Sequence, residues 1–407
     1  MRFAHMADCH IGAWREPKLR DANMQAFFRA VEICIEKRVD FVLIAGDLFN
    51  TAFPSIDSLK DTVLKLRELK DKKIPVYIIP GSHDYSPSGK TMLDVLENAK
   101  LFTNVFRGSV SDGKLSLSFT RDEKTGAKIT GILGKRGMLE KSYYENLERE
   151  PLEKESGFKI FMFHSPIQEL SGADSHFESA PISFLPKGFN YYAGGHVHTV
   201  LEKDFSGYGK IVYPGPIFPN SFSEVEELQN GGFFIVDADE NSLKAEYEPI
   251  VAYNTCPISI ECTGKSAEEV TTSIIDAGEK REFINTIVLI RLSGKLSTGK
   301  ISDINFTEIF SYFYGKGAFF VMKNTFSLKS DEFTEVMISS DSVEKIEEAM
   351  IEENSSQMNL SGCSREEIKG ILHELIKALS AEKREGERQA DFEARLKSDA
   401  EKALNIN

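Results

Sequence analysis

Five apolar runs of this sequence each lead into a residue that can bind a metal ion. The runs cover residues 3–7, 41–45, 75–80, 160–163 and 191–193. Their length and continuous apolar character are typical of strands buried on both faces of a parallel sheet. The residues that follow them are Asp8 and His10, Asp47, Ser82 and His83, His164, and His196 and His198. Because open α/β sheets carry their chemistry at the carboxyl edge, we expect these side chains to meet there.

The residue types at these strand ends indicate a divalent metal site. In extended backbone, residues two apart project to the same side, so Asp8 and His10 are expected to point together and Cys9 away from them. Carboxylates and imidazoles without thiolates suit Mn²⁺, Fe²⁺ or Zn²⁺. The set holds more ligands than one ion needs, which favours two ions sharing Asp47 as a bridge. Such a pair of ions is typical of phosphoester hydrolysis.

The pattern of apolar residues predicts a layered α/β fold. Helical periodicity separates the first strands, at residues 20–38, 55–72 and 88–100, which is the rhythm of an α/β domain. From residue 191 the pattern turns to strands without long helices, and these would complete a second sheet. The fold class is therefore α/β, with a two-sheet β-sandwich flanked by helices.

Two further segments follow this domain, which we expect to cover residues 1–250. Strand and helix signals at residues 251–341 predict a small α+β capping domain. Residues 342–407 predict a helical C-terminal tail, with helices at 343–358, 365–380 and 381–404. The second of these helices carries an apolar stripe that needs to be buried on the protein or on a partner. The stripe consists of Ile368, Ile371, Leu372, Leu375, Ile376 and Leu379.

Charge and cysteine content restrict the function further. The formal charge of −14 argues against a protein that coats nucleic acid by bulk electrostatics, so contact with nucleic acid would need a local patch, bound metal or a basic partner. Five scattered cysteines form no pairwise framework, which suits a reducing cytoplasm. No apolar run reaches the length of a membrane-spanning helix, so we expect a cytoplasmic protein without a membrane partner.

The ordered motifs resemble those of the calcineurin-like metallophosphoesterase superfamily. That pattern reads D-x-H, G-D, G-N-H-[DE], H and G-H-x-H. This chain has ADCHIG, AGDLFN, PGSHDYSPSG, FMFHSP and YYAGGHVH in the same order, followed by YPGPIFPNSF. More closely, it resembles the SbcD branch, the archaeal counterpart of the meiotic recombination eleven nuclease in double-strand-break repair.

The resemblance implies a role for each strand-end residue. One metal would be held by Asp8, His10, Asp47 and His198, and the other by Asp47, Ser82, His164 and His196. His83 would face the substrate and act in catalysis, stabilising the transition state or protonating the leaving group. The implied enzyme is a nucleoid-associated nuclease with two Mn²⁺ per subunit, with Mg²⁺, Fe²⁺ or Zn²⁺ as other possible ions. It would act as a 3′–5′ exonuclease on duplex DNA ends and an endonuclease on single strands or hairpins.

Two residues depart from the family pattern. Ser82 stands where the family usually has Asn, and a hydroxyl is a shorter and poorer ligand than an amide carbonyl. The second metal is therefore expected to bind more weakly or through a water. Asn50 stands where relatives often carry a DNA-facing His, so the handling of DNA at Asn50 is expected to differ.

The family resemblance also implies two protein partners. An SbcC-type coiled-coil ABC ATPase would bind the C-terminal helices, and a second copy of the chain would form a homodimer. Leu59, Val63, Leu93 and Leu96 are candidates for an apolar dimer seam, although they would serve equally well to cover the sheet.

Other residues near the motifs have more than one interpretation. Asp84 is expected to orient a neighbouring residue rather than to bind metal. Lys135, Arg136 and the loop residue His176 could face DNA, or could simply be solvated. His5, inside the first strand, is expected to be structural.

Two other functions remain open. A phosphoesterase acting on phosphoproteins, cyclic nucleotides or small monoesters could use the same metal site. Against it, GDLF lacks the further acidic residue of the phosphoprotein phosphatase pattern G-D-x-x-D. The third hypothesis, suggested by Ser82 alone, is a weakly catalytic scaffold for the ATPase.

Overall fold

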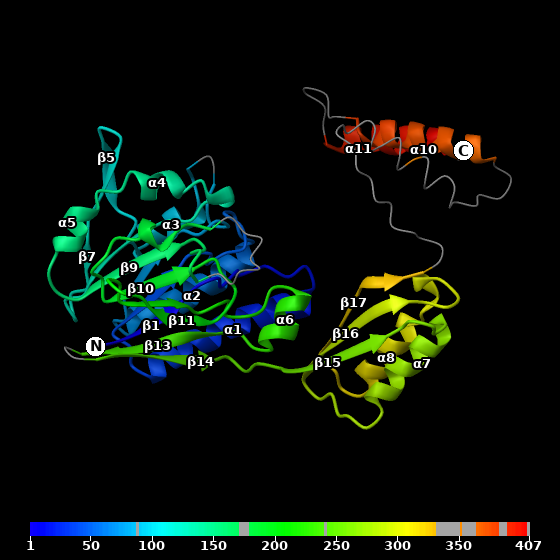
Figure 1. The fold of residues 1–407 in the computed structure, drawn as a ribbon, viewed down its shortest axis with the longest axis horizontal. Coiled ribbons are helices and arrows are strands. Elements are labelled where there is room, and N and C mark those ends of the chain that lie inside the picture. The colour runs from blue at the N-terminus through cyan, green and yellow to red at the C-terminus, as the bar shows by residue number, and fades with distance from the viewer. Residues whose placement is uncertain are drawn as a thin grey trace. The chain divides into compact units, whose positions relative to one another are not determined.

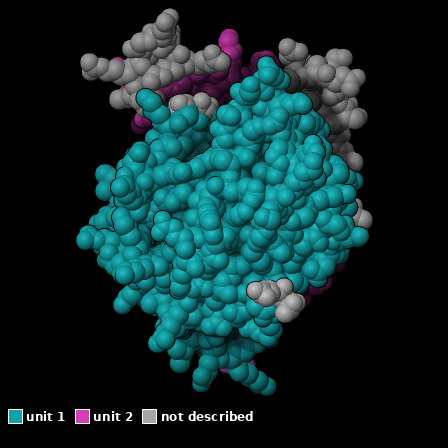
Figure 2. All heavy atoms as spheres, turned by 90° about the vertical axis from the view of Figure 1, so that its left-hand side faces the viewer, with its two compact units in different colours: residues 1–258, 280–290, 310–324 teal, residues 259–279, 291–309, 325–407 magenta. Residues whose placement is uncertain are grey.

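We analysed a computed structural model of the chain. It describes residues 1–86, 89–170, 179–239, 242–330, 351, 364–381 and 389–404. Two compact units make up the chain (Figures 1 and 2): residues 1–258, 280–290 and 310–324 form the first, and residues 259–279, 291–309 and 325–407 form the second. These units divide the chain at other places than the three expected domains, whose boundaries stay a prediction.

The first sheet contains six strands in the order β14-β13-β1-β2-β3-β4. The strands β1 to β4 are parallel, and β13 and β14 continue the sheet in antiparallel pairing. Their bounds are Arg2–Met6 (β1), Phe41–Ala45 (β2), Val76–Ile79 (β3), Thr103–Asn104 (β4), Gly232–Ala238 (β13) and Leu243–Pro249 (β14).

The second sheet also contains six strands, in the order β11-β12-β10-β9-β8-β7. Its four central strands are parallel, and β7 and β11 pair antiparallel at the two edges. The bounds are Thr120–Arg121 (β7), Lys128–Ile132 (β8), Lys159–His164 (β9), Tyr191–Gly195 (β10), Leu201–Asp204 (β11) and Lys210–Tyr213 (β12).

Alternating side chains of the central strands enter two different cores. In β2, Leu43 packs between the two sheets, while Val42 and Ile44 pack under the helices on the outer face. In β9, Met162 faces the space between the sheets, and Phe161 faces the outer core of the second sheet. Both strands are buried along their whole length, which explains why they read as unbroken apolar runs. The predicted two-sheet α/β fold is thus confirmed.

Helices α1, α2 and α3 contribute to the outer core of the first sheet, and their starts follow local sequence preferences. Helix α1 (Pro17–Glu36) begins three residues earlier than expected, because Pro17 suits the first turn. Helix α2 (Ile56–Asp71) begins after Ser55, whose side chain accepts a hydrogen bond from the Ser58 N–H. Helix α3 (Met92–Asn98) is shorter than predicted and begins after a capping box formed by Thr91 and Asp94.

Shorter elements complete the first 250 residues. A hairpin joins β5 and β6, and short helices lie between the strands. Their bounds are Gly108–Ser111 (β5), Lys114–Leu117 (β6), Lys141–Glu145 (α4), Arg149–Lys154 (α5) and Phe222–Leu228 (α6), with 3₁₀ turns at Arg136–Met138 (η1) and Ile182–Phe184 (η2).

The remaining elements include a three-stranded sheet in the order β15-β16-β17 and the C-terminal helices. Their bounds are Asn254–Glu261 (β15), Ala267–Gly278 (α7), Thr286–Lys295 (β16), Ile301–Asp303 (η3), Phe306–Gly315 (α8), Phe320–Lys329 (β17), Arg365–Leu379 (α10) and Gln389–Ala403 (α11). Except for residue 351, the helix expected at 343–358 lies outside the described residues. In the part of the chain that is described, no helix is long and apolar enough to cross a membrane.

The loop after β1 is fixed from two sides. Its backbone continues to pair with the loop after β2, through hydrogen bonds from the N–H groups of Asp8 and His10 to the carbonyls of Gly46 and Asp47. On the other side, the buried side chain of Asn23 in α1 donates to the Cys9 carbonyl at 2.9 Å and accepts from the Gly12 N–H at 3.3 Å. Asn23 therefore links the helix layer to the loop that carries Asp8 and His10.

We expect Asn23→Ala to lower the free energy of unfolding by about 1–3 kcal/mol, because two backbone groups would lose their partner in a buried place. Urea denaturation measures the change. Gln25→Ala, at an exposed position of the same helix, is the matched control and should stay within about 0.5 kcal/mol of the unmodified protein. Equal stabilities of the two variants would contradict this role of Asn23.

Candidate metal centre

The ends of β1, β2, β3, β9 and β10 bring their polar residues together, as the sequence predicts. Three groups of possible ligands have their nitrogen or oxygen atoms within 4.8 Å of one another. The groups are Asp8, His10 and His198; His10, Asp47 and His83; and Asp8, Asp47 and His164. Because each group shares members with another, they form one continuous cluster that joins the two sheets.

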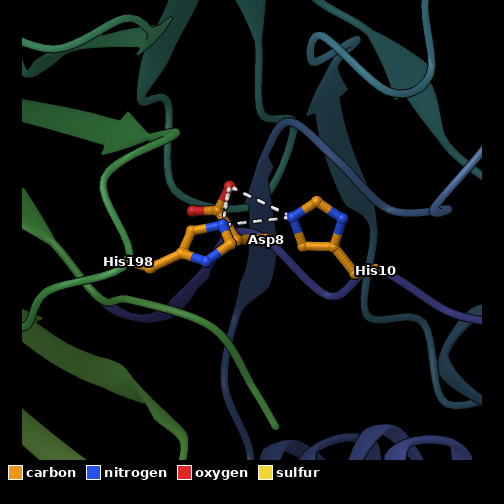
Figure 3. A group of neighbouring side chains, drawn as sticks. All are labelled: Asp8, His10 and His198. Carbon is orange, nitrogen blue, oxygen red and sulfur yellow. Dashed lines mark hydrogen bonds and ion pairs between the residues drawn. The ribbon is translucent and has the colours of Figure 1, made fainter. Parts of the chain in front are cut away.

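The first group is drawn in Figure 3, where two imidazoles and one carboxylate face each other. His198 Nε2 lies 3.2 Å from His10 Nε2 and 3.7 Å from Asp8 Oδ1. His10 Nε2 lies 4.0 Å from the same Asp8 oxygen. Three donor atoms from two separate loops therefore converge on one small volume.

Asp47 belongs to both the second and the third group. Its Oδ2 atom is 3.2 Å from His164 Nε2 and 3.7 Å from His10 Nε2. Its Oδ1 atom accepts a hydrogen bond from the His83 N–H at 2.7 Å, and the Ser82 hydroxyl lies 3.4 Å from Oδ2. Asp47 thus has the contacts expected of a carboxylate shared between two ions.

Several imidazoles are held through the ring nitrogen that lies away from the cluster. His164 Nδ1 lies 2.8 Å from the Ala45 carbonyl, and His83 Nδ1 lies 2.8 Å from the Asn50 carbonyl. His198 Nδ1 lies 3.1 Å from a carboxylate oxygen of Glu224. Metal-binding histidines are typically oriented in this way.

His196 belongs to none of the three groups but lies beside them. Its N–H donates to both oxygens of Asp8 at 3.0 Å, and its ring centroid lies 5.2 Å from that of His164.

The donor atoms fit a divalent cation. His164 is completely buried, yet its Nε2 atom makes no hydrogen bond to any described residue. Asp8 and Asp47 are buried too, and within the described ranges their only cationic neighbours are histidines. Buried carboxylates need a compensating charge, and oxygen and imidazole donors without sulfur suit Mn²⁺, Fe²⁺ or Zn²⁺. The residues present therefore fit the metal that the motifs imply.

Burial and the attraction between opposite charges shift the pKa values of these groups in different directions. Burial raises the pKa of Asp8 and lowers the pKa of His10 to about 3 and that of His196 to about 4. For His164, burial is outweighed by the attraction of Asp47, which raises the pKa of the imidazole to about 10. For Asp47, the attraction of His164 outweighs burial and holds the pKa of the carboxyl below its usual range. Both shifts follow from the 3.2 Å approach of Asp47 Oδ2 and His164 Nε2.

The backbone around the cluster is unusual. Asp8, His10, Asp47 and His196 all have positive φ, at 50°, 41°, 52° and 83°. The expectation of extended backbone at Asp8 and His10 is thus wrong, although the two side chains do converge. Left-handed backbone is unfavourable for such residues and persists where the surroundings hold it, which is common at functional sites.

Glycines allow the loops to approach each other closely. A Cβ atom on Gly46 would lie 2.1 Å from His164 Nδ1, and one on Gly81 would lie 2.2 Å from Asp47 Oδ1. A Cβ atom on Gly195 would meet the Ala45 carbonyl oxygen at 2.0 Å. Side chains at these positions would push the donor atoms apart.

Asp84 supports the loops from behind. Its carboxylate accepts hydrogen bonds from the N–H groups of Leu48, Phe49 and Gly81 at 3.0–3.1 Å. Burial, with a further contribution from Asp47, raises its pKa to about 7. These contacts support the expected orienting role of Asp84, which stays a prediction.

The residues expected to face DNA have different surroundings. Asn50 contacts the site through its carbonyl, which lies 2.8 Å from His83 Nδ1. Lys135 Nζ lies 3.0 Å from the Tyr143 hydroxyl, and Arg136 is exposed. His176 lies outside the described residues. His5 is buried in β1 beside the Tyr191 hydroxyl, in keeping with a structural role.

Glu224 and Gly134 were not identified from the sequence. Gly134 packs on the His164 ring, where a Cβ atom would lie 2.5 Å from Cδ2. The Ser-x-x-Glu pattern from Ser221 to Glu224 predicts the start of α6. Nothing in that pattern indicates that Glu224 reaches His198, because the contact depends on the tertiary fold.

Comparisons with known proteins agree with this geometry. Residues 1–200 match the calcineurin-like phosphoesterase family. The chain is 29% identical over 282 residues to the DNA double-strand break repair protein Mre11 of Methanopyrus kandleri, covering 66% of this chain and 61% of that protein. It is 31% identical over 256 residues to the Mre11 of Methanococcus maripaludis, covering 58% and 63%. With the Mre11 of Methanocaldococcus jannaschii it shares 29% identity over 296 residues, covering 70% and 73%.

The chain thus spans less than two thirds of the length of the first two relatives. The matched residues include every strand end that contributes to the cluster. Residues 1–200 form a calcineurin-like metallophosphoesterase domain, and the chain is similar to proteins of the Mre11 type.

Proposed function

We propose that this protein is a two-metal DNA phosphodiesterase, the nuclease subunit of a double-strand-break repair complex. The observation that carries the proposal is the buried cluster around Asp47, in a chain similar to proteins named for DNA double-strand break repair. The proposed activities are 3′–5′ exonuclease cleavage of duplex ends and endonuclease cleavage of single strands.

We propose two Mn²⁺ ions at the cluster, with Mg²⁺, Fe²⁺ or Zn²⁺ as alternatives. When bound, two such ions lower the pKa of a water between them and stabilise the charge on the phosphoryl oxygens. The first would be held by Asp8, His10, Asp47 and His198, and the second by Asp47, Ser82, His164 and His196. The Ser82 hydroxyl is shorter than an Asn side chain, so it favours weaker binding at the second position.

His83 is proposed to act on the leaving oxygen. Its Nδ1 atom faces the Asn50 carbonyl, which can only accept, so this nitrogen carries a proton. Nε2 must then carry a second proton for His83 to act as an acid. Its ring stands edge-on to that of His10, with the centroids 4.7 Å apart, so the acid would lie beside the bound ions.

We expect His83→Ala to slow Mn²⁺-dependent DNA cleavage about 10²–10⁴-fold, the usual contribution of a positioned acid or base. Cleavage of linear duplex and of circular single strands measures the rate, and metal analysis verifies that Mn²⁺ is still bound. His373→Ala, at an exposed position of α10, is the matched control and should cleave normally.

The same assay separates the three hypotheses. Unchanged cleavage by His83→Ala would contradict its catalytic role. Fast hydrolysis of p-nitrophenyl esters without cleavage of DNA would favour a small-molecule or phosphoprotein phosphoesterase instead. A protein that binds Mn²⁺ and cleaves neither substrate would favour a scaffold.

Lys135 is the best supported of the proposed DNA contacts. The Lys135 ammonium lies over the rings of Tyr85 and Tyr143, at 5.3 and 4.4 Å from their centroids. Among the described residues it forms no ion pair, unlike many cations of this acidic chain. The preceding Gly134 donates to the Pro80 carbonyl, which places Lys135 beside the loop of Ser82 and His83. Contacts of Arg136, Asn50 and His176 with DNA stay predictions.

A phosphate contact by Lys135 predicts a specific salt effect. In the His83→Ala background, where cleavage is slowed, adding Lys135→Ala should reduce the slope of log Kd against log salt by about 1. Fluorescence anisotropy over a range of salt concentrations measures the slope. Lys244→Ala, on the exposed edge strand β14, should leave it unchanged. An unchanged slope with Lys135→Ala would refute the contact.

A homodimer is proposed through α2 and α3, with different residues from those expected. Leu93 and Leu96 are buried in the core, so they cover the sheet, the alternative that the sequence left open. The large apolar side chains exposed on these helices and the loop before them are Phe53, Ile56, Leu64 and Val95.

We expect the double variant Ile56→Glu, Leu64→Glu to be a monomer, because a second copy could no longer bury these apolar residues. Light scattering at micromolar concentration measures the mass of the unmodified protein and of the variant. A monomeric unmodified protein, or a variant that remains dimeric, would contradict this interface.

We propose that α10 and α11 bind the SbcC-type coiled-coil ABC ATPase. The two helices contact each other, and Ile368 is buried, while Leu379 and Leu404 are exposed. We expect a chain truncated before residue 364 to lose binding to such an ATPase. If the truncated chain still copurified with the ATPase, this assignment would be contradicted.

A further inference from the structure

We propose that Glu224 is a positioning residue that aims His198 at the first metal ion. Its carboxylate holds Nδ1 of the imidazole, so that Nε2 faces the donor atoms of Asp8 and His10. The catalytic meaning of this contact rests on the proposed metal centre, whereas the contact itself can be tested without it.

The contact between Glu224 and His198 Nδ1 also orients the Nε2 atom on the other side of the ring. Glu224 Oε1 lies 3.1 Å from Nδ1, and on the other side of the ring Nε2 lies 3.2 Å from His10 Nε2 and 3.7 Å from Asp8 Oδ1. The two nitrogens of an imidazole point in different directions, so fixing one also fixes the aim of the other. A carboxylate partner further makes Nε2 a stronger donor to a cation.

Glu224 is itself held firmly. Its second carboxylate oxygen, Oε2, accepts a hydrogen bond from the Asn220 N–H at 2.8 Å. Its own N–H donates to the hydroxyl of Ser221, which caps α6, at 3.2 Å. In the described part of the chain Glu224 has no lysine or arginine partner. Its carboxylate is therefore available to interact with the His198 imidazole.

His198 needs such a partner more than His164 does. The His164 side chain is completely buried and is enclosed by Gly46, Gly134 and Gly195. The His198 side chain is 28% exposed and lies on the loop beyond β10. Because packing alone restrains it less, a charged hydrogen-bond partner is the main contact that fixes its rotamer.

The test compares Glu224→Ala with Glu224→Gln in the full chain. Mn²⁺ affinity is measured from the electron paramagnetic resonance signal of free Mn²⁺, and the tautomer of His198 from nitrogen-15 NMR of the metal-free protein. We expect Glu224→Ala to weaken Mn²⁺ binding about 10–100-fold and to lose the Nδ1-protonated tautomer. Glu224→Gln keeps an acceptor oxygen, so it should retain the tautomer and restore part of the affinity.

Two control variants separate positioning from helix stability. Glu227→Gln changes an exposed glutamate of the same helix and should bind Mn²⁺ normally. Ser221→Ala removes the cap of α6 but leaves the Glu224 carboxylate and its contact with the Asn220 N–H in place, so it should weaken Mn²⁺ binding far less than Glu224→Ala does.

Two results would overturn the proposal. One is unchanged affinity and an unchanged His198 tautomer in Glu224→Ala. The other is a loss of affinity in Ser221→Ala equal to that in Glu224→Ala, which would assign the effect to helix capping. If the unmodified protein bound no Mn²⁺, the proposed metal centre would fail, and the NMR signal of His198 would decide the Glu224 contact by itself.

Discussion

The contact between Asp47 and His164 is the interaction on which the rest of the structure depends. Asp47 follows β2 of the first sheet, and His164 ends β9 of the second, so their 3.2 Å approach joins the two sheets at one edge. Both side chains are buried, and placing an uncompensated carboxylate there would cost several kcal/mol. The contact raises the pKa of His164, which favours a compensating charge on the imidazole, and a bound divalent cation would also compensate the carboxylate. The same contact therefore joins the two sheets and contributes to the metal centre.

Close approach of the loops explains several features that look unrelated in the sequence. Gly46 and Gly81 leave room where a Cβ atom would strike His164 or Asp47. Asp84 uses three backbone N–H groups to hold the loops after β2 and β3 together. The left-handed backbone of Asp8 and Asp47 is maintained by hydrogen bonds that continue the pairing of β1 and β2 beyond the strands. Backbone contacts of the loops thus fix the positions of the donor atoms in the cluster.

Much of the fold and the cluster could be predicted from the sequence, because both depend on short-range patterns. Buried parallel strands appear as apolar runs, and a polar residue after each run must lie at the sheet edge. The positive φ angles of Asp8 and His10 could not be predicted in this way, because an apolar run does not specify the backbone conformation of the residues that follow it. The partner of His198 was missed for a similar reason, because Glu224 looks like an ordinary capping residue. Burial of Leu93 and Leu96 depends on how α3 packs, which helical periodicity leaves open.

Residues from five strand ends are proposed to bind two divalent cations jointly, with Asp47 between them. A crystal of the full chain soaked in Mn²⁺, with anomalous scattering measured at the manganese edge, tests this proposal most directly. We expect two peaks about 3.5–4 Å apart on either side of the Asp47 carboxylate, the weaker of them beside Ser82. Electron density that showed these side chains correctly placed with no anomalous peak among them would contradict the account.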